Sequence, residues 1–273
     1  MCELFGFSSS REEELNDYLK TFYSHCEEHP HGWGLAVLDA DKFNVRKEPV
    51  KARSSVMLGN ILLNPIEAKN VLAHIRLATI GDLEFYNCHP FVKKDNSGRR
   101  WTLIHNGTVF DSQDLCKYST IEEGETDSER ILLAILDHIN NYEEHKGKSL
   151  NLRERFEVVS NLIGDLSHNN KLNLIVHDGE QMYIHTNLKD SLYYLEGENS
   201  ILVSTKALDF KDWKEVPINT VFSFINGELL FESKPHSNEY VETEEQIRFI
   251  EKFIESLKTD SDEEYAWWFS LLS

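Results

Sequence analysis

The sequence predicts a layered α+β protein in which two antiparallel β-sheets are covered by helices. Strands come first, two consecutive helices occupy the middle of the chain, and strands return after them. Consecutive strands without crossover helices favour antiparallel sheets, and amphipathic helices must bury their apolar faces against a sheet. With 273 residues, 40% of them hydrophobic, the chain is long enough for one large domain or two modest ones.

The first half of the chain is expected to contain mostly strands. Residues 2–8 are expected to form a short strand, with Leu4, Phe5 and Phe7 in near-alternation. Ser8, Ser9 and Ser10 offer N-caps for a helix whose apolar positions run from Leu15 to Cys26. The other strands expected here span residues 33–38, 43–47, 71–77 and 101–105.

The second half opens with the two helices. Residues 126–129, Thr-Asp-Ser-Glu, have the form of a capping box, and a second apolar stripe covers residues 152–166. Asn226-Gly227 is a strong hairpin signal. Strands are expected at residues 172–176, 182–185, 201–204, 221–225 and 229–231. Near Pro235 the pattern changes, which divides the chain into a domain of residues 2–235 and an extension, 236–273, of one helix and an apolar tail.

Composition excludes several classes of function. The chain has 28 Lys plus Arg against 47 Asp plus Glu, a net charge of −19 that disfavours nucleic acid. No stretch approaches the ~20 apolar residues of a membrane helix, and the N-terminus lacks the features of a signal peptide. The four cysteines have no CxxC spacing, which indicates reduced thiols and a cytoplasmic location.

Cys2 is the first candidate for chemistry. Removal of Met1 would leave Cys2 with a free α-amino group beside its thiol. A thiol of pKa ~8.5 is mostly protonated at neutral pH, and an α-amino group of pKa ~7.7–8.0 can accept its proton and return it to a leaving amine. Nucleophile and base would then reside in one residue.

Four more residues carry groups suited to an amide substrate. Asn106 and Gly107 follow an expected strand and offer a side-chain amide and an unhindered backbone N–H to a developing oxyanion. Arg76 ends an apolar strand and suits a carboxylate, and Asp127 at the start of a helix suits an ammonium. Glutamine carries both of these groups. An ordinary structural role is the alternative for each: an ion pair for Arg76, a hairpin turn for Asn106-Gly107 and a helix N-cap for Asp127.

Six short motifs together resemble the class II glutamine amidotransferases, the family with an N-terminal cysteine, and most closely their small stand-alone members. The motifs are Met-Cys-Glu-Leu-Phe-Gly (1–6), His-Gly-Trp-Gly-Leu-Ala (31–36), His-Ile-Arg-Leu-Ala-Thr (74–79), Asn-Cys-His-Pro-Phe (87–91), His-Asn-Gly (105–107) and Gly-Glu-Thr-Asp-Ser-Glu (124–129). The resemblance covers roughly residues 2–232. It implies the four-layer αββα sandwich of the N-terminal-nucleophile hydrolases, here with a C-terminal helical extension.

The resemblance also implies roles for six residues. Cys2 would be the nucleophile, and Asn106 and Gly107 would form the oxyanion hole. The glutamine-binding residues would be Arg76, Thr79 and Asp127. His74 and His105 are expected to be packing or supporting groups. The loop of residues 25–31 departs from the family, because His31 stands where an acidic residue is common and the Arg-Gly pair of the fused synthases is missing.

No cofactor or metal is expected, since the histidines and cysteines of residues 25–31 fit no standard zinc spacing. Three functions remain open: a stand-alone hydrolase of glutamine or a γ-glutamyl amide, possible in thiol metabolism as for some small relatives; a glutaminase subunit that supplies ammonia to a separate synthase; and a non-catalytic glutamine sensor. The tail of residues 266–272 would pack on its own domain or serve as a surface for a protein partner or a homo-oligomer.

Overall fold

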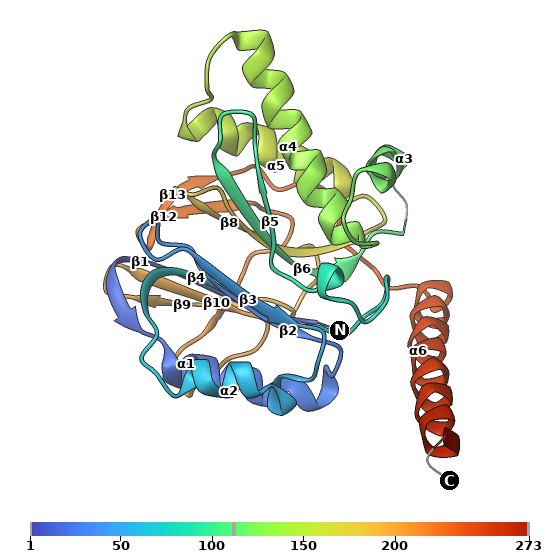
Figure 1. Cartoon of the computed structure of the whole chain (residues 1–273). Coiled ribbons are helices and arrows are strands. Elements are labelled where there is room, and N and C mark those ends of the chain that lie inside the picture. The colour runs from blue at the N-terminus through green and yellow to red at the C-terminus, as the bar shows by residue number, and fades with distance from the viewer. Residues whose placement is uncertain (1, 111–112, 272–273) are drawn as a thin grey trace.

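The two sheets lie face to face between two layers of helices, as the computed structural model of the chain shows (Figure 1). It describes residues 2–110 and 113–271, with side chains through Leu257. The strands are β1 (Glu3–Glu14), β2 (Trp33–Val37), β3 (Asn44–Glu48), β4 (Glu67–Ile75), β5 (Phe91–Lys94), β6 (Arg100–Thr108), β7 (Lys171–His177), β8 (Met182–His185), β9 (Tyr193–Gly197), β10 (Ser200–Ser204), β11 (Lys214–Glu215), β12 (Phe222–Ile225) and β13 (Glu228–Glu232). The helices are α1 (Asn16–Ser24), α2 (Val56–Leu62), α3 (Gln113–Cys116), α4 (Asp127–Lys146), α5 (Leu152–Leu166) and α6 (Glu244–Leu271).

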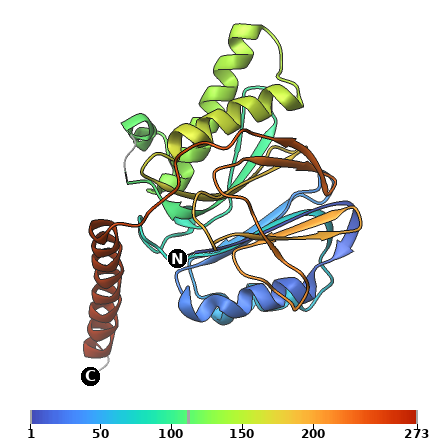
Figure 2. The same ribbon diagram turned by 180° about the vertical axis from the view of Figure 1, so that it is seen from behind.

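The strand order confirms the predicted pair of antiparallel sheets. One sheet has seven strands in the order β11-β9-β10-β1-β4-β2-β3, and the other has six in the order β13-β12-β8-β7-β6-β5. Helices α1 and α2 cover the seven-stranded sheet, and α4 and α5 cover the six-stranded sheet (Figures 1 and 2). The αββα layering implied by the resemblance is therefore confirmed.

Three hydrophobic clusters correspond to the interfaces between these layers. One lies under α4 and α5 and includes Leu132, Phe156 and Leu174, and another lies under α1 and α2 and includes Phe5 and Leu19. The third cluster fills the space between the two sheets. Its members alternate along β1 and β6 with residues of the helix-facing clusters, as expected for strands buried on both faces.

The sequence reading was wrong about where the first helix begins. Strand β1 continues through the three serines to Glu14, so these residues cap no helix, and α1 begins at Asn16. In β1, Ser8 and Ser9 pair with β10, and Gly227 N–H donates to Ser8 Oγ at 3.2 Å. Polar side chains with ladder and turn partners are compatible with a strand, and this tertiary context outweighs their preference for helix caps.

Helix α4 shows only half of the predicted capping box. Thr126 Oγ1 accepts from Glu129 N–H at 3.2 Å, as a cap should. The Glu129 carboxylate instead accepts from the N–H groups of Glu123 and Gly124, both at 2.9 Å. Glu129 therefore fixes the turn before the helix. A complete capping box occurs at α5, between Asn151 and Glu154.

Helix α6 stands to the side of the sandwich (Figures 1 and 2). It contacts the body near its first turns, where the rings of Phe249 and Phe110 are 6.0 Å apart between centroids. The predicted stripe from Ile247 to Leu257 remains partly exposed. The side chains of the apolar tail, residues 266–272, lie outside the described residues, and the division at residue 235 stays a prediction.

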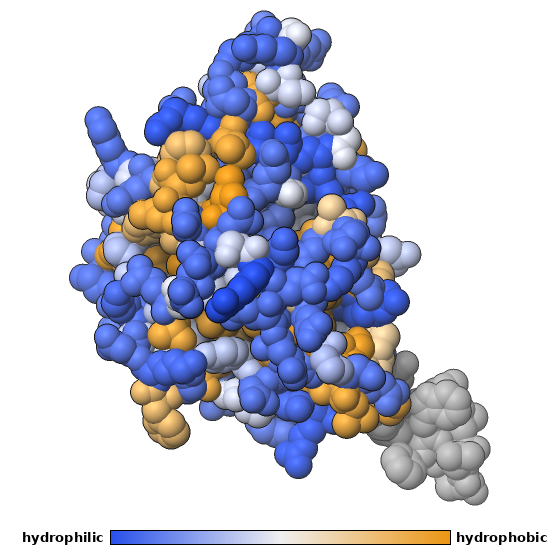
Figure 3. All heavy atoms as spheres, turned by 90° about the vertical axis from the view of Figure 1, so that its left-hand side faces the viewer, coloured by the Kyte–Doolittle hydropathy of each residue, from blue (hydrophilic) through white to orange (hydrophobic). Residues whose placement is uncertain are grey.

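The surface carries both hydrophilic and apolar areas (Figure 3). Figure 3 shows that one face of the molecule is mostly hydrophilic and carries separate apolar areas. Within residues 2–110 and 113–271, no helix is long and apolar enough to cross a membrane.

Candidate active site

Cys2 lies directly before β1, against the backbone that follows β4. Its Sγ accepts from Leu77 N–H and donates to Leu77 O, both at 3.2 Å. Burial raises the pKa of the Cys2 thiol, and four groups oppose that shift: the N-terminal amine, the Leu77 N–H, and the positive charges of Arg76 and Lys171. The thiol is thus held in one place and surrounded by groups that favour its ionised form.

The face of β6 that carries Asn106 is directed toward the same layer as Cys2. Leu4 of β1 and Ile104 of β6 both pack in the cluster between the sheets. Because side chains alternate along a strand, Cys2 continues the face of Leu4 and Asn106 continues the face of Ile104. Asn106 is buried, with 5% of its surface exposed.

Gly107 occupies a position in β6 that no other residue fits. A Cβ added there would lie 1.9 Å from Lys171 O and 2.4 Å from His105 Nε2. Strand β7 therefore approaches β6 more closely than a side chain would allow. This close approach explains why a glycine follows Asn106 and excludes a turn at Asn106-Gly107, since both residues pair with β7 in the ladder.

Hydrogen bonds connect Thr79 and Asp127 to the end of β6. Thr79 Oγ1 lies 3.0 Å from Thr108 Oγ1, which joins the segment after β4 to the end of β6. Asp127 Oδ2 accepts from Val109 N–H at 2.7 Å, which joins the start of α4 to the same strand end. Asp127 is 7% exposed, and the N-cap of α4 is Thr126, so capping is not the role of Asp127.

Arg76 holds the loop that follows it. Its Nη1 donates to Asp82 O at 2.9 Å, and its Nη2 donates to Ile80 O and Gly81 O at 3.0 and 2.9 Å. These bonds use three of the five N–H donors of a guanidinium, so two remain for a substrate. Burial lowers the pKa of Arg76, which the nearby Asp127 partly opposes. A structural ion pair, the alternative role, is not found for Arg76 among the ion pairs of the described residues.

The sequence reading missed Glu3, which anchors the loop of residues 25–31 beside the nucleophile. Its buried carboxylate lies 2.7 Å from His25 Nδ1 and 2.7 Å from Lys206 Nζ. Burial opposes ionisation of Glu3, but these partners outweigh it, and its pKa lies below the usual value. A lone glutamate beside a cysteine gives no signal in the sequence, because its partners are 22 or more residues away.

His31, at the other end of this loop, is also bound next to the nucleophile. The ring Nδ1 of His31 accepts from Ala78 N–H at 2.9 Å, and the backbone N–H of His31 donates to Arg76 O at 3.0 Å. When the imidazole is neutral, acceptance at Nδ1 places the proton on Nε2. His31, which differs from the family pattern, is therefore hydrogen-bonded to the residue that follows Leu77, the partner of Cys2.

His74 and His105 occupy supporting positions. His74 Nε2 lies 3.1 Å from His105 O, and His105 Nδ1 lies 3.0 Å from Ser128 Oγ. Burial lowers the pKa of His74 to about 3 and also lowers that of His105. Both rings are neutral near pH 7; the His74 ring links the two sheets, and the His105 ring links β6 to α4.

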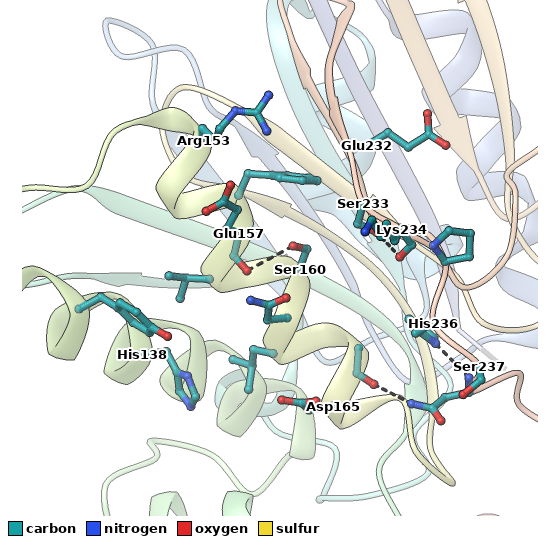
Figure 4. A pocket seen from close by; sticks show the side chains of 18 residues that line it. His138, Arg153, Glu157, Ser160, Asp165, Glu232, Ser233, Lys234, His236 and Ser237 are labelled. Carbon is teal, nitrogen blue, oxygen red and sulfur yellow. Dashed lines mark hydrogen bonds between the residues drawn. The ribbon is translucent and has the colours of Figure 1, made fainter.

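Two further features of the molecule are relevant to the candidate site: groups that could hold a metal ion, and the cavity beside α5. Within the described chain no group of three or more His, Cys, Asp or Glu side chains could hold a metal ion. A cavity of about 1090 Å³ lies between α5 and the segment after β13, where Figure 4 shows Arg153, Glu157, Asp165 and His236 around it. None of the six predicted site residues lines this cavity.

Cys2 directly before the first strand of an αββα sandwich, with the Asn106-Gly107 pair on the facing sheet, is an arrangement within the fold of the N-terminal-nucleophile hydrolases. The family model for class II glutamine amidotransferases matches residues 1–201. The chain therefore belongs to the class II glutamine amidotransferases.

Three relatives illustrate the likeness. An uncharacterized protein of Methanocaldococcus jannaschii is 26% identical over 261 residues, which cover 86% of this chain and 72% of that protein. The crystal structure of a "predicted glutamine amidotransferase" from Pseudomonas aeruginosa has a TM-score of 0.60 at 18% identity, and the match covers 84% of this chain and all of that one. Glutamine phosphoribosylpyrophosphate amidotransferase from B. subtilis has a TM-score of 0.64 at 15% identity, and the match covers 87% of this chain and 50% of that one. These two structures establish the likeness of fold.

Proposed function

We propose that the chain hydrolyses the γ-amide of glutamine or of a γ-glutamyl compound through a thioester on Cys2 and releases glutamate. The observation that carries the proposal is one continuous set of contacts. Cys2 Sγ is hydrogen-bonded to the backbone of Leu77, and Thr79 is hydrogen-bonded to Thr108, which follows the Asn106-Gly107 pair. Asp127 accepts a hydrogen bond from the N–H of Val109. The nucleophile, the oxyanion donors and the groups for an amino-acid end are thus within one region of the molecule.

The proposed reaction begins with removal of Met1. The α-amine of Cys2 accepts the thiol proton, Sγ attacks the γ-carbonyl carbon, and the C–N bond breaks as the α-amine returns the proton to the leaving amine. Water then cleaves the thioester. Asn106 Nδ2 and Gly107 N–H stabilise the negative oxygen of each tetrahedral intermediate. The two donors left on Arg76 take the α-carboxylate, and the Asp127 carboxylate takes the α-ammonium.

The test is release of glutamate by purified protein whose mass shows that Met1 is absent. Glutamine and a panel of γ-glutamyl amides should be hydrolysed, and Cys2→Ala should abolish hydrolysis without changing the thermal melting temperature. Activity in a population that fully retains Met1 would contradict the N-terminal amine as base.

Two other functions would give different outcomes in the same assay. A glutaminase subunit would hydrolyse glutamine slowly alone and much faster with a partner protein. A glutamine sensor would bind glutamine, raise its melting temperature with it, and release no glutamate. No turnover of any γ-glutamyl amide by fully processed protein, with or without a partner, would refute the proposed hydrolase.

A further inference from the structure

Lys171, the first residue of β7, is the least ordinary charged residue near Cys2. Only 2% of its surface is exposed, whereas lysines are almost never fully buried unless they are paired. Burial lowers its pKa to about 8, and the charges of Glu242 and Cys2 oppose that shift. Lys171 acts on Cys2 in turn, because its positive charge favours ionisation of the Cys2 thiol.

Strand register places Lys171 on the face of the sheet that carries the oxyanion donors. Thr108 of β6 is opposite Lys171, and Asn106 is opposite Asn173. Residues directly opposite in an antiparallel pair share a face, so Lys171 lies beside Thr108 and diagonal to Asn106. The alternate residues Leu172 and Leu174 point to the other face, in the cluster under α4 and α5.

The backbone of Lys171 is fixed as firmly as its register. Its carbonyl oxygen lies 3.2 Å from His105 Nε2, and it is the atom against which a Cβ at Gly107 would collide. The residue cannot shift along β7 without disturbing the Gly107 position. The backbone of Lys171 is therefore fixed beside the strand that carries Asn106 and Gly107.

The charged groups around Cys2 come from separate elements. The N-terminal amine precedes β1, Arg76 follows β4 and Lys171 begins β7. Asp127 of α4 acts on Arg76 and His105, and the segment before α6 contributes Glu242, which acts on Lys171. Arg76 holds the loop after β4, whereas Lys171 is tied to the oxyanion strand.

We propose that the Lys171 ammonium is an electrostatic positioning residue of the active site that favours the thiolate form of Cys2. The inference deepens the proposed function and rests on it for its catalytic meaning. Lys171 stays an ammonium throughout the reaction. The thiol proton goes to the α-amine, and Lys171 changes only the field in which the sulfur charge develops.

The experiment measures the reactivity of the Cys2 thiol directly. Full-length, Met1-processed protein in a Cys116→Ser background, which removes the exposed cysteine, is alkylated with iodoacetamide from pH 5.5 to 9.5, and modification of Cys2 is followed by peptide mass spectrometry. Lys171→Met should raise the midpoint of alkylation and, at pH 7, where Lys171 is charged, lower the alkylation rate about tenfold. Lys171→Arg keeps the charge and should restore the wild-type midpoint.

Lys47→Met is the matched control. Burial also lowers the pKa of Lys47, but its ammonium donates to Cys88 O at 2.7 Å and lies in the field of Cys88. Its loss should leave the Cys2 midpoint unchanged. If Lys171→Met does not fold, Lys171→Gln, which keeps a polar group at the site, serves in its place.

The outcomes separate this inference from the proposed function. An unchanged Cys2 midpoint in folded Lys171→Met or Lys171→Gln overturns the role of Lys171, whatever the protein hydrolyses. A raised midpoint that Lys171→Arg restores supports it even if no γ-glutamyl amide is turned over, in which case only the proposed hydrolysis fails. A raised midpoint that Lys171→Arg does not restore indicates a packing effect and also overturns the inference.

Discussion

Gly107→Ala is the sharpest test of the oxyanion site, because the structure supplies the size of the perturbation. The added Cβ would lie 1.9 Å from Lys171 O, and real Cβ contacts essentially never fall below 3.0 Å. The strands must separate by at least 3.0 − 1.9 = 1.1 Å at this point. The colliding atom belongs to the backbone of β7, so no side-chain rotation can relieve the contact.

A displacement of about 1 Å at a catalytic group can cost about 10² in rate, and loss of an oxyanion donor costs about 10²–10³ in kcat. We therefore expect kcat for γ-amide hydrolysis to fall at least about 10²-fold. Overpacking of this kind should also lower the free energy of unfolding by about 1–3 kcal/mol.

Gly59→Ala provides the same chemical change where nothing obstructs it. No atom lies within 4 Å of a Cβ at Gly59, which is inside α2, and replacing a helical glycine with alanine should stabilise the protein by up to about 1 kcal/mol. The assays are glutamate release at saturating substrate and thermal unfolding. Wild-type kcat in folded Gly107→Ala would refute the assignment of Gly107 as an oxyanion donor.

Three further predictions follow from named contacts. Arg76→Lys should raise KM for glutamine at least about tenfold, because one ammonium cannot replace a planar fork that also holds three loop carbonyls; a KM within twofold of wild type would contradict this. Arg155→Met should lower the free energy of unfolding by about 3–5 kcal/mol in urea titrations, because it leaves the fully buried Asp178 carboxylate without its 2.7 Å partner; a loss under about 1 kcal/mol would be inconsistent with that pairing. Burial lowers the pKa of His74 and of His185 to about 3, so below pH ~6.5 the unfolded chain binds more protons than the folded chain. The free energy of unfolding should therefore decline from pH ~6.5 toward pH 3 by up to about 1.4 kcal/mol per pH unit for each histidine. A urea midpoint that stays constant between pH 6.5 and 4.5 would argue against neutral rings.

Much of the fold could be read from local patterns. Strand β8 was predicted with its observed bounds, 182–185, because apolar residues there lie between clear turn signals. The short strands β5, β9 and β11 and helix α2 were missed. The exposed pattern of β11, Lys214–Glu215, is set only by its pairing with β9. Local sequence carries no signal for such an element, because distant partners decide it.

The candidate site also contains residues that local motifs predict and residues that only distant partners distinguish. Cys2, Arg76, Thr79, Asn106, Gly107 and Asp127 could be predicted because each belongs to a short motif that resembles a known family. Glu3 and Lys171 could not, since what distinguishes them is burial and the charges of residues from 22 to 203 positions away in the chain. Composition alone suggests solvent-exposed roles for both.

The loop of residues 25–31 contacts both Glu3, which the sequence did not single out, and the segment after β4, which belongs to a predicted motif. At one end Glu3, the neighbour of the nucleophile in sequence, holds His25, and at the other end His31 accepts from Ala78 in the segment that contacts Cys2. This loop, fixed at both ends beside the sulfur, is our proposed wall on the leaving-group side of the substrate, and it departs from the pattern of the fused synthases at His31. In the proposed reaction, selectivity for a leaving group larger than ammonia would be decided by this wall, whereas Arg76 and Asp127 would bind the glutamyl end that all such substrates share. If the two ends of the substrate meet different segments in this way, leaving-group preference can change without loss of the glutamyl site.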